Sequence, residues 1–223
     1  MKRYLFVLVL VGLSGLFVTG RANPVDELLE RIDSGASKKF KTELVKAGKD
    51  DADFFELSQQ GKRVVVRGNT WVNVATGVNW YLKYYAGVHI TWNNPKAKLP
   101  DVLPAVTQKE RRETALKLRY DFNYCTFSYS MAFWDWERWQ QEIDWMALHG
   151  VNMPLAIVGE ECVWRNLLLR LGYSEEDVGR FIAGPAFLAW WEMNNLEGWG
   201  GPRPLSWYAR QEKLQHQILG RMK

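Results

Sequence analysis

The sequence contains little cysteine and little histidine. Its 223 residues include two cysteines and three histidines, and the histidines are single and widely spaced. Two cysteines are too few for a disulfide framework or a cysteine-based zinc site, and no metal-ligand pair emerges. Cys125 and Cys162 could pair in an exported protein or could be buried thiols near a site, and we favour the second interpretation.

Several signature motifs are also absent. The chain has no G-x-S-x-G, no P-loop and no G-x-G-x-x-G, which mark nucleophile elbows, phosphate-binding loops and dinucleotide sites. Residues 23–223 lack an Asn-x-Ser/Thr sequon, which favours a bacterial envelope over a eukaryotic secretory route. Lysine and arginine form no sustained basic stripe, so no nucleic-acid partner is indicated.

The first 22 residues have the pattern of a signal peptide. Lys2 and Arg3 precede an apolar run over residues 5–18 that is short for a membrane span, and residues 20–22 (Gly-Arg-Ala) form a cleavage pattern. Removing the three basic residues of this segment lowers the formal net charge from +4 to +1. The mature chain is therefore expected to begin at Asn23, without a membrane span. We expect it in a bacterial periplasm or outside the cell rather than in a lysosome.

Tryptophan, by contrast, is abundant. An indole offers a large apolar face with one donor on its edge, and the tryptophans here are interleaved with acids and amides. Most of them, taken singly, are expected to be core residues, but their density favours carbohydrate, because a sugar ring has an apolar face and a hydroxyl rim. Nine of the twelve lie within residues 119–207: Trp134, Trp136, Trp139, Trp145, Trp164, Trp190, Trp191, Trp199 and Trp207.

Residues 23–106 are predicted to form a small α/β domain with a linker. A helix is expected over residues 24–32, with proline at its first position, and another over 70–86, where apolar residues recur every three or four positions. The three prolines of "NNPKAKLPDVLP" indicate a loop over residues 93–104. Short apolar or β-branched segments predict strands at 40–45, 53–57, 63–66 and 88–92.

Residues 107–223 alternate between predicted strands and predicted helices. Strands are predicted at 116–125 and 151–158, and the helices at 136–149, 161–171, 174–182 and 206–222. This alternation is typical of parallel βαβ units. We therefore expect an α/β fold in which the small N-terminal domain precedes the first units of a (β/α)8 TIM barrel, truncated at residue 223. A complete two-domain protein with a minimal sheet is the alternative.

Polar side chains follow both predicted barrel strands. Asn123 and Cys125 end the first strand, and Gly159, Glu160 and Glu161 follow the second. Working residues of parallel α/β proteins lie just past the carboxyl ends of strands. The glutamates could accept hydrogen bonds from a sugar or act as acid or base, or they could simply complement the dipole of the next helix.

Long segments of the chain closely resemble the α-N-acetylglucosaminidases of glycoside hydrolase family 89. They are "FNYCTFSYSMAFWDWERWQQEIDWMALHGVNMPLA", "GEECVW", "GPAFLAWWEMNNLEGWGGPRPLSW", "LQHQILGRM" and, for the small N-terminal domain, "GNTWVNVATGVNWYLKYYAGVHITW". The resemblance implies hydrolysis of terminal α-linked N-acetylglucosamine from glycans with retention of configuration, and no cofactor. It places both catalytic glutamates on later barrel strands, beyond Lys223, so the chain by itself is expected to be inactive.

The same resemblance implies which residues bind the sugar. Asn123 and Cys125 match the family's N-x-C-T, and Gly159 and Glu161 match its G-Q-E. The sequence departs from the family at Glu160, where glutamine is common, and also at Ile157 and Glu197, which leaves the details of the subsite open. The competing interpretations are a non-catalytic carbohydrate-binding module, which should show many short strands, and an interaction protein, which would not need amides and acids at strand ends.

Overall fold

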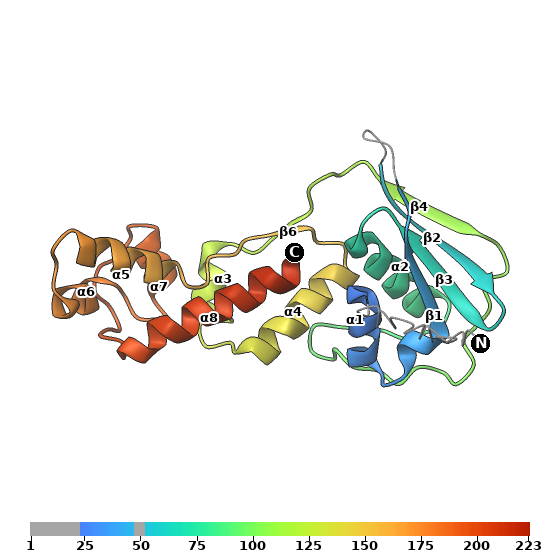
Figure 1. The fold of residues 1–223 in the computed structure, drawn as a ribbon, viewed down its shortest axis with the longest axis horizontal. Coiled ribbons are helices and arrows are strands. Elements are labelled where there is room, and N and C mark those ends of the chain that lie inside the picture. Colours follow the sequence, from blue (N-terminus) through green and yellow to red (C-terminus); the bar gives the residue numbers. More distant parts are fainter. Residues whose placement is uncertain (1–22, 47–51) are drawn as a thin grey trace, which may run out of the picture.

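The computed structural model describes residues 23–46 and 52–223 (Figure 1). The predicted signal peptide lies outside these residues. None of the helices within the described ranges is long and apolar enough to cross a membrane. The molecule is elongated, with the N-terminal sheet at one end and the helices α4 (Trp136–Leu148) and α8 (Leu205–Met222) side by side in the middle. The other end holds α5 (Glu160–Arg170), α6 (Glu175–Phe181) and α7 (Leu188–Glu192).

The N-terminal part is a four-stranded mixed sheet covered by helices. Its strands are β1 (Phe40–Leu44), β2 (Asp53–Gln60), β3 (Arg63–Gly68) and β4 (Glu110–Thr114), in the order β1-β3-β2-β4. β1 is parallel to β3, and β2 is antiparallel to both β3 and β4. The helices are α1 (Pro24–Ile32), the short 3-10 helix η1 (Ala36–Lys39) and α2 (Trp71–Tyr84).

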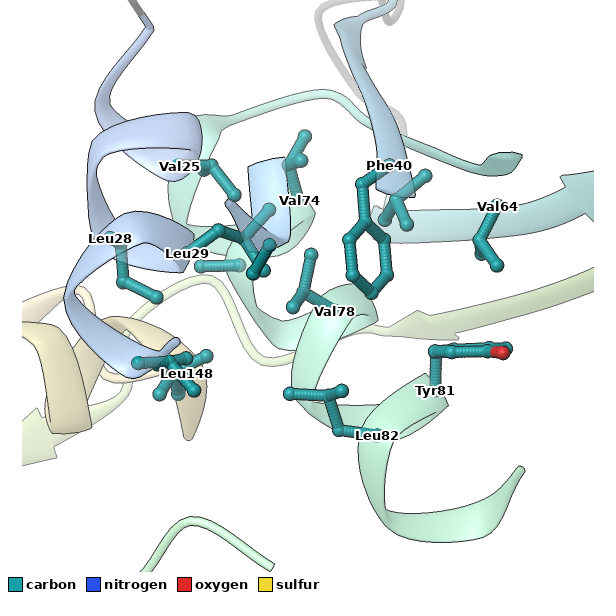
Figure 2. Packing of buried hydrophobic residues seen from close by; sticks show 14 of the residues in the cluster. Val25, Leu28, Leu29, Phe40, Val64, Val74, Val78, Tyr81, Leu82 and Leu148 are labelled. Carbon is teal, nitrogen blue, oxygen red and sulfur yellow. The ribbon is translucent and has the colours of Figure 1, made fainter. Parts of the chain in front are cut away.

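One apolar core joins these elements. Leu29 of α1, Val64 of β3 and Val78 of α2 are fully buried in it, and Figure 2 shows Phe40 lying between Leu29 and Val64 in the same core. Leu148, at the end of α4 in the second half of the chain, is buried in the same core. The N-terminal domain therefore packs directly against α4.

Local sequence explains where the N-terminal helices begin. The Asn23 side chain caps α1 by accepting from the backbone N–H groups of Val25 and Asp26, and Pro24 occupies the first helical position, where no N–H is needed. Thr70 caps α2 in the same way, accepting from Asn73 N–H at 3.1 Å. These two helices form where the sequence predicts them.

The predicted strand at residues 88–92 is wrong. Val88 and Ile90 are buried in the core, so the apolar pattern reports burial and not strand pairing. Trp92 instead reaches α4, where its indole N–H donates to Glu142 at 2.7 Å. The fourth strand is β4, which pairs with β2 although it follows the expected domain boundary at residue 106. We propose that the boundary lies after Thr114.

The second half begins a parallel barrel with very short strands. β5 (Tyr120–Asp121) and β6 (Met153–Pro154) pair in parallel and are connected through the helices α3 (Tyr124–Tyr129) and α4 (Trp136–Leu148). The expected βαβ order is therefore present. The remaining helices are α5 (Glu160–Arg170), α6 (Glu175–Phe181), α7 (Leu188–Glu192) and α8 (Leu205–Met222).

Both predicted barrel strands are too long. Residues 116–125 give only β5, because Leu116 and Leu118 are exposed and Asn123 already caps α3 by accepting from Thr126 N–H. Residues 151–158 give only β6, and beyond it Leu155, Ile157 and Val158 pack against the Trp139 cluster of α4. The two missed helices, α3 and α7, have six and five residues, too short for a clear period in the sequence.

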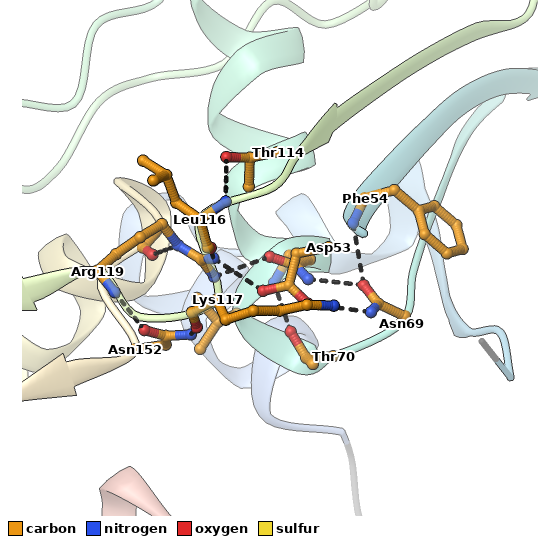
Figure 3. A network of polar contacts seen from close by, with 12 residues as sticks. Asp53, Phe54, Asn69, Thr70, Thr114, Leu116, Lys117, Arg119 and Asn152 are labelled. Carbon is orange, nitrogen blue, oxygen red and sulfur yellow. Dashed lines mark hydrogen bonds and ion pairs between the residues drawn. The ribbon is translucent and has the colours of Figure 1, made fainter. Parts of the chain in front are cut away.

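Two polar networks fix the N-terminal domain to the barrel. The Arg119 guanidinium bonds Asp53 of β2 at 2.8 Å and the carbonyl oxygens of Leu116 and Gly150, as Figure 3 shows in part. Asp144 of α4 accepts from Arg31 of α1 at 2.5 and 2.9 Å and from Arg221 of α8 at 3.0 Å. The start of β5 and the end of α8 are thereby held against the N-terminal unit.

Candidate functional site

The carboxyl ends of β5 and β6 lie at one edge, because the two strands are parallel neighbours. Asn123 follows β5 as the N-cap of α3, and Gly159 follows β6 as the N-cap of α5. Gly159 has a φ of 83°, a conformation that glycine adopts at little cost. A Cβ added there would lie 3.3 Å from the Gln211 carbonyl oxygen of α8, so the turn is also tightly packed.

A small cavity opens beside this edge. Its volume is about 40 Å³. Apolar walls come from Phe127, Ile157 and Leu188, and polar groups from Glu161, Glu192 and Gln211. It therefore lies where α3, α5, α7 and α8 meet.

Glu161 is the most constrained acid of the site. It is 2% exposed, and its Oε1 accepts from the indole N–H of Trp207 at 2.9 Å. Its Oε2 is buried without a hydrogen-bond partner. The residue is thus a fixed acceptor on the cavity wall, and it does more than complement the dipole of α5.

Glu192 of α7 is the second acid on the cavity wall. Both of its carboxylate oxygens are buried and unpartnered. Burial, followed by the like charges of Glu160 and Glu161, raises the pKa of Glu192 to about 8, although Arg203 opposes the shift. The Glu160 pKa is also raised, by burial and by Glu161. The carboxyl of Glu192 is therefore mainly protonated at neutral pH.

The two cysteines are free thiols. Cys125 is half-buried in the first turn of α3. Cys162 is buried in α5, where its Sγ contacts the Tyr208 carbonyl oxygen at 3.1 Å and burial raises its pKa to about 12. Of the two interpretations, the favoured one, buried thiols near a site, agrees with this arrangement better than a disulfide.

The structure brings together only part of the predicted site. Gly159 and Glu161 line the cavity, whereas Asn123 and Cys125 lie at the same edge outside its lining. Sequence reasoning missed Glu192, Gln211 and the role of Trp207. The available signal was an acid within the aromatic run "AWWEMNN", an unusual place for a charge.

Two of the nine tryptophans within residues 119–207 are buried, and three more pack partly buried against an apolar cluster. Trp139 and Trp191 are 1% and 6% exposed and belong to apolar clusters. Trp199 is 62% exposed, and Trp190 packs edge-on against the exposed Tyr129. No group of three or more metal-ligating side chains occurs within the described ranges.

Comparison with known proteins gives one consistent family. Residues 23–105 match the alpha-N-acetylglucosaminidase (NAGLU) N-terminal domain, and residues 119–223 match the alpha-N-acetylglucosaminidase (NAGLU) TIM-barrel domain. The human alpha-N-acetylglucosaminidase is 44% identical over 178 residues, which are 79% of this chain and 24% of the human protein.

Solved structures agree with the sequence families. The family 89 glycoside hydrolase from Clostridium perfringens, in complex with 2-acetamido-1,2-dideoxynojirimycin, superposes with a TM-score of 0.84 at 38% identity. The match covers 89% of this chain and 23% of that one. A variant of the Clostridium enzyme has two glutamates changed to glutamine and is bound to its substrate GlcNAc-alpha-1,4-galactose. It superposes with a TM-score of 0.83 at 37% identity. The chain thus spans about a quarter of the length of these relatives, and it belongs to the α-N-acetylglucosaminidase family, glycoside hydrolase family 89.

Proposed function

We propose that this chain forms the sugar-recognising beginning of an α-N-acetylglucosaminidase, which removes terminal α-linked N-acetylglucosamine from glycans. The observation that carries the proposal is the match to the Clostridium enzyme over 89% of the chain at a TM-score of 0.84. The ligands of that enzyme are an acetamido sugar mimic and GlcNAc-alpha-1,4-galactose. A non-catalytic binding module is disfavoured, because the described second half is helical and not a sandwich of many short strands.

The proposed sugar-binding residues are Asn123, Cys125, Gly159 and Glu161. Asn123 is exposed at the barrel edge, with its side-chain oxygen engaged on Thr126 N–H, so its amide N–H groups are available to a sugar hydroxyl. Glu161 is held by Trp207 and offers acceptor capacity toward the cavity. Gly159 keeps the backbone close at the start of α5, and Cys125 presents a half-buried thiol in the first turn of α3.

Catalysis with retention needs two carboxyl groups about 5–5.5 Å apart, one a nucleophile and the other an acid/base. Glu161 is buried and hydrogen-bonded to Trp207, and both oxygens of Glu192 are buried. Neither carboxyl is free to attack a sugar ring. We propose that the catalytic pair is supplied by other parts of the enzyme and that residues 23–223 alone hydrolyse nothing.

The proposed sugar binding by Asn123 can be separated from its role as a helix cap. Asn123→Ala removes both, whereas Asn123→Asp keeps a capping oxygen and removes only the amide donor. In the full-length enzyme both variants should lower kcat/KM on an aryl α-N-acetylglucosaminide by roughly 5- to 150-fold, because leaving a buried polar partner unpaired costs about 1–3 kcal/mol. Glu161→Ala should lose activity over the same range. Cys125→Ser should be milder, since a hydroxyl can replace a thiol contact.

Two outcomes would count against this proposal. Near-normal kinetics of Asn123→Asp and Glu161→Ala, with unchanged folding, would remove these residues from the subsite. Turnover by residues 23–223 that disappears in Glu161→Gln would show that the chemistry lies within this chain. Proton NMR of the first sugar released should show the α-anomer if configuration is retained.

We further propose that the chain is exported, with cleavage before Asn23. The support is the basic, apolar and small-residue order of the first 22 residues. N-terminal sequencing of the protein from its native host should begin at Asn23. An intact Met1 on the mature protein would contradict export by this route.

A further inference from the structure

Three carboxylate oxygens in the described part of the chain are buried without a hydrogen-bond partner: Oε2 of Glu161 and both oxygens of Glu192. Both residues line the cavity beside the barrel edge. Two ionised carboxylates in such a place would lose their hydration with a single donor, the Trp207 indole N–H on Glu161, to replace it, which costs several kcal/mol in typical cases. Something must offset the charge or remove it.

The charged groups around the Glu192 carboxyl do not remove this problem. Glu160 and Glu161 of α5 repel it, and Arg203 attracts it. Tyr124 of α3 also lies near it, because the charge of Glu160, burial and then the charge of Glu192 raise the Tyr124 pKa. Nε and Nη2 of Arg203 are themselves buried without partners, so no direct ion pair forms. A proton therefore compensates the charge of Glu192, in agreement with its raised pKa.

The size of the cavity limits what can occupy the space beside the two carboxyl groups. One water needs roughly 10–15 Å³ of such a cavity, so about 40 Å³ holds about three or four waters and no sugar ring. The two carboxyl groups and the Gln211 amide provide polar partners. No group of three or more metal-ligating side chains occurs in the described residues.

We propose that Glu192 is a positioning residue, which holds one proton jointly with Glu161 through water in this cavity. The pair then carries a single negative charge, and Glu161 stays on the indole N–H of Trp207 with its Oε2 buried at the cavity. Loss of the shared proton to solvent leaves two carboxylates that repel each other, and Glu161 moves off Trp207. The consequence for catalysis rests on the proposed function, but the protonation of the pair does not.

The protonation is tested by carboxyl-carbon NMR on the full chain, labelled at glutamate, over a pH titration. The wild-type protein should show a glutamate carboxyl that titrates near pH 8. Its signal should be absent in Glu192→Gln and should titrate at lower pH in Glu161→Gln, because interacting sites titrate as a pair. Glu176→Gln, at an exposed surface ion pair of α6, is the matched control and should change nothing. If every glutamate titrates in the ordinary range, with a pKa of about 4.3, the proposal is overturned.

The positioning role is tested by the pH profile of kcat/KM in the full-length enzyme. Wild type should lose activity as the pH rises through about 8, and Glu192→Gln should keep its activity through that range, because its neutral amide cannot ionise. An active Glu192→Gln enzyme with the wild-type alkaline limb would contradict the role of Glu192. If the enzyme has no glycosidase activity while the NMR titration is as expected, the proposed function fails and the shared proton stands.

Discussion

At the scale of single residues, the same chemical group behaves differently according to its surroundings. Glu56 and Glu110 lie beside lysine or arginine at the N-terminal sheet, and their pKa values are lowered. Glu142 and Glu192 are buried beside the barrel helices, and their pKa values are raised, in each case chiefly by desolvation. The barrel part thus concentrates acids that favour a proton, as functional sites commonly do.

Stability should therefore fall as the pH rises from about 5 to 8. In this window the folded chain keeps a proton on Glu192 that the unfolded chain releases, so the free energy of unfolding decreases with pH. A single carboxyl group changes the free energy of unfolding by at most about 1.4 kcal/mol per pH unit. Urea unfolding of wild type and Glu192→Gln at several pH values measures the effect. The variant should show a shallower decline, and identical slopes would contradict the assignment.

The two thiols should differ strongly in reactivity. The thiolate is the reactive form, and burial raises the Cys162 pKa to about 12, whereas Cys125 is half-buried at the barrel edge. Native protein treated with iodoacetamide at pH 8 should be alkylated at Cys125 first, as read by peptide mass spectrometry. Denatured protein, in which both thiols react, provides the control. Absence of any free thiol would indicate a disulfide and contradict the structure.

At the scale of elements, the turn at Gly159 sets the start of α5 and the position of Glu161. Its backbone conformation and its contact with Gln211 both disfavour a side chain. Gly159→Ala should lower the free energy of unfolding by about 1–3 kcal/mol, measured by urea unfolding. Gly172→Ala is a matched control, since Gly172 has a φ of 93° but nothing near an added Cβ.

The difference between the two glycine variants reports the contact between α5 and α8. Gly172→Ala should show only the cost of the backbone conformation, about 1 kcal/mol. Gly159→Ala should cost more and should also disturb Glu161. Equal effects of the two variants would mean that the backbone alone accounts for the loss.

At the scale of the whole molecule, Asp144 of α4 joins α1 and α8, two helices that lie far apart in the sequence. It bonds Arg31 of α1 and Arg221 of α8, and these side chains are mostly buried. Asp144→Asn should lower the free energy of unfolding by about 1–3 kcal/mol, because two arginines lose a charged acceptor. Hydrogen exchange should also rise in the last turn of α8.

An exposed ion pair provides the control for Asp144. Glu176 and Arg180 are paired on α6 with more than two thirds of each side chain exposed. Glu176→Gln should cost less than about 0.5 kcal/mol. If Asp144→Asn is equally mild, the network does not hold the N-terminal domain to the barrel.

Local sequence was sufficient to determine the helices with clear caps and periods and the parallel order of the barrel strands. Pro24 and Asn23 define α1, Ser174 and Asp177 form the capping box that begins α6, and the long motifs identify the family. These features depend on neighbours in the chain, so residue types and spacing are enough to predict them.

Only the tertiary structure decided the remaining features. The apolar run at 88–92 is buried at Val88 and Ile90 without strand pairing. The run at 151–158 pairs only at β6 and beyond it packs, partly buried, against the Trp139 cluster of α4. β4 joins the sheet across about fifty residues from its partner β2. The proton on Glu192 depends on Glu160, Glu161 and Arg203, which lie far from it along the chain or face it only after folding. Burial and the electrostatic field of distant residues set its charge, and neither can be read from neighbouring sequence.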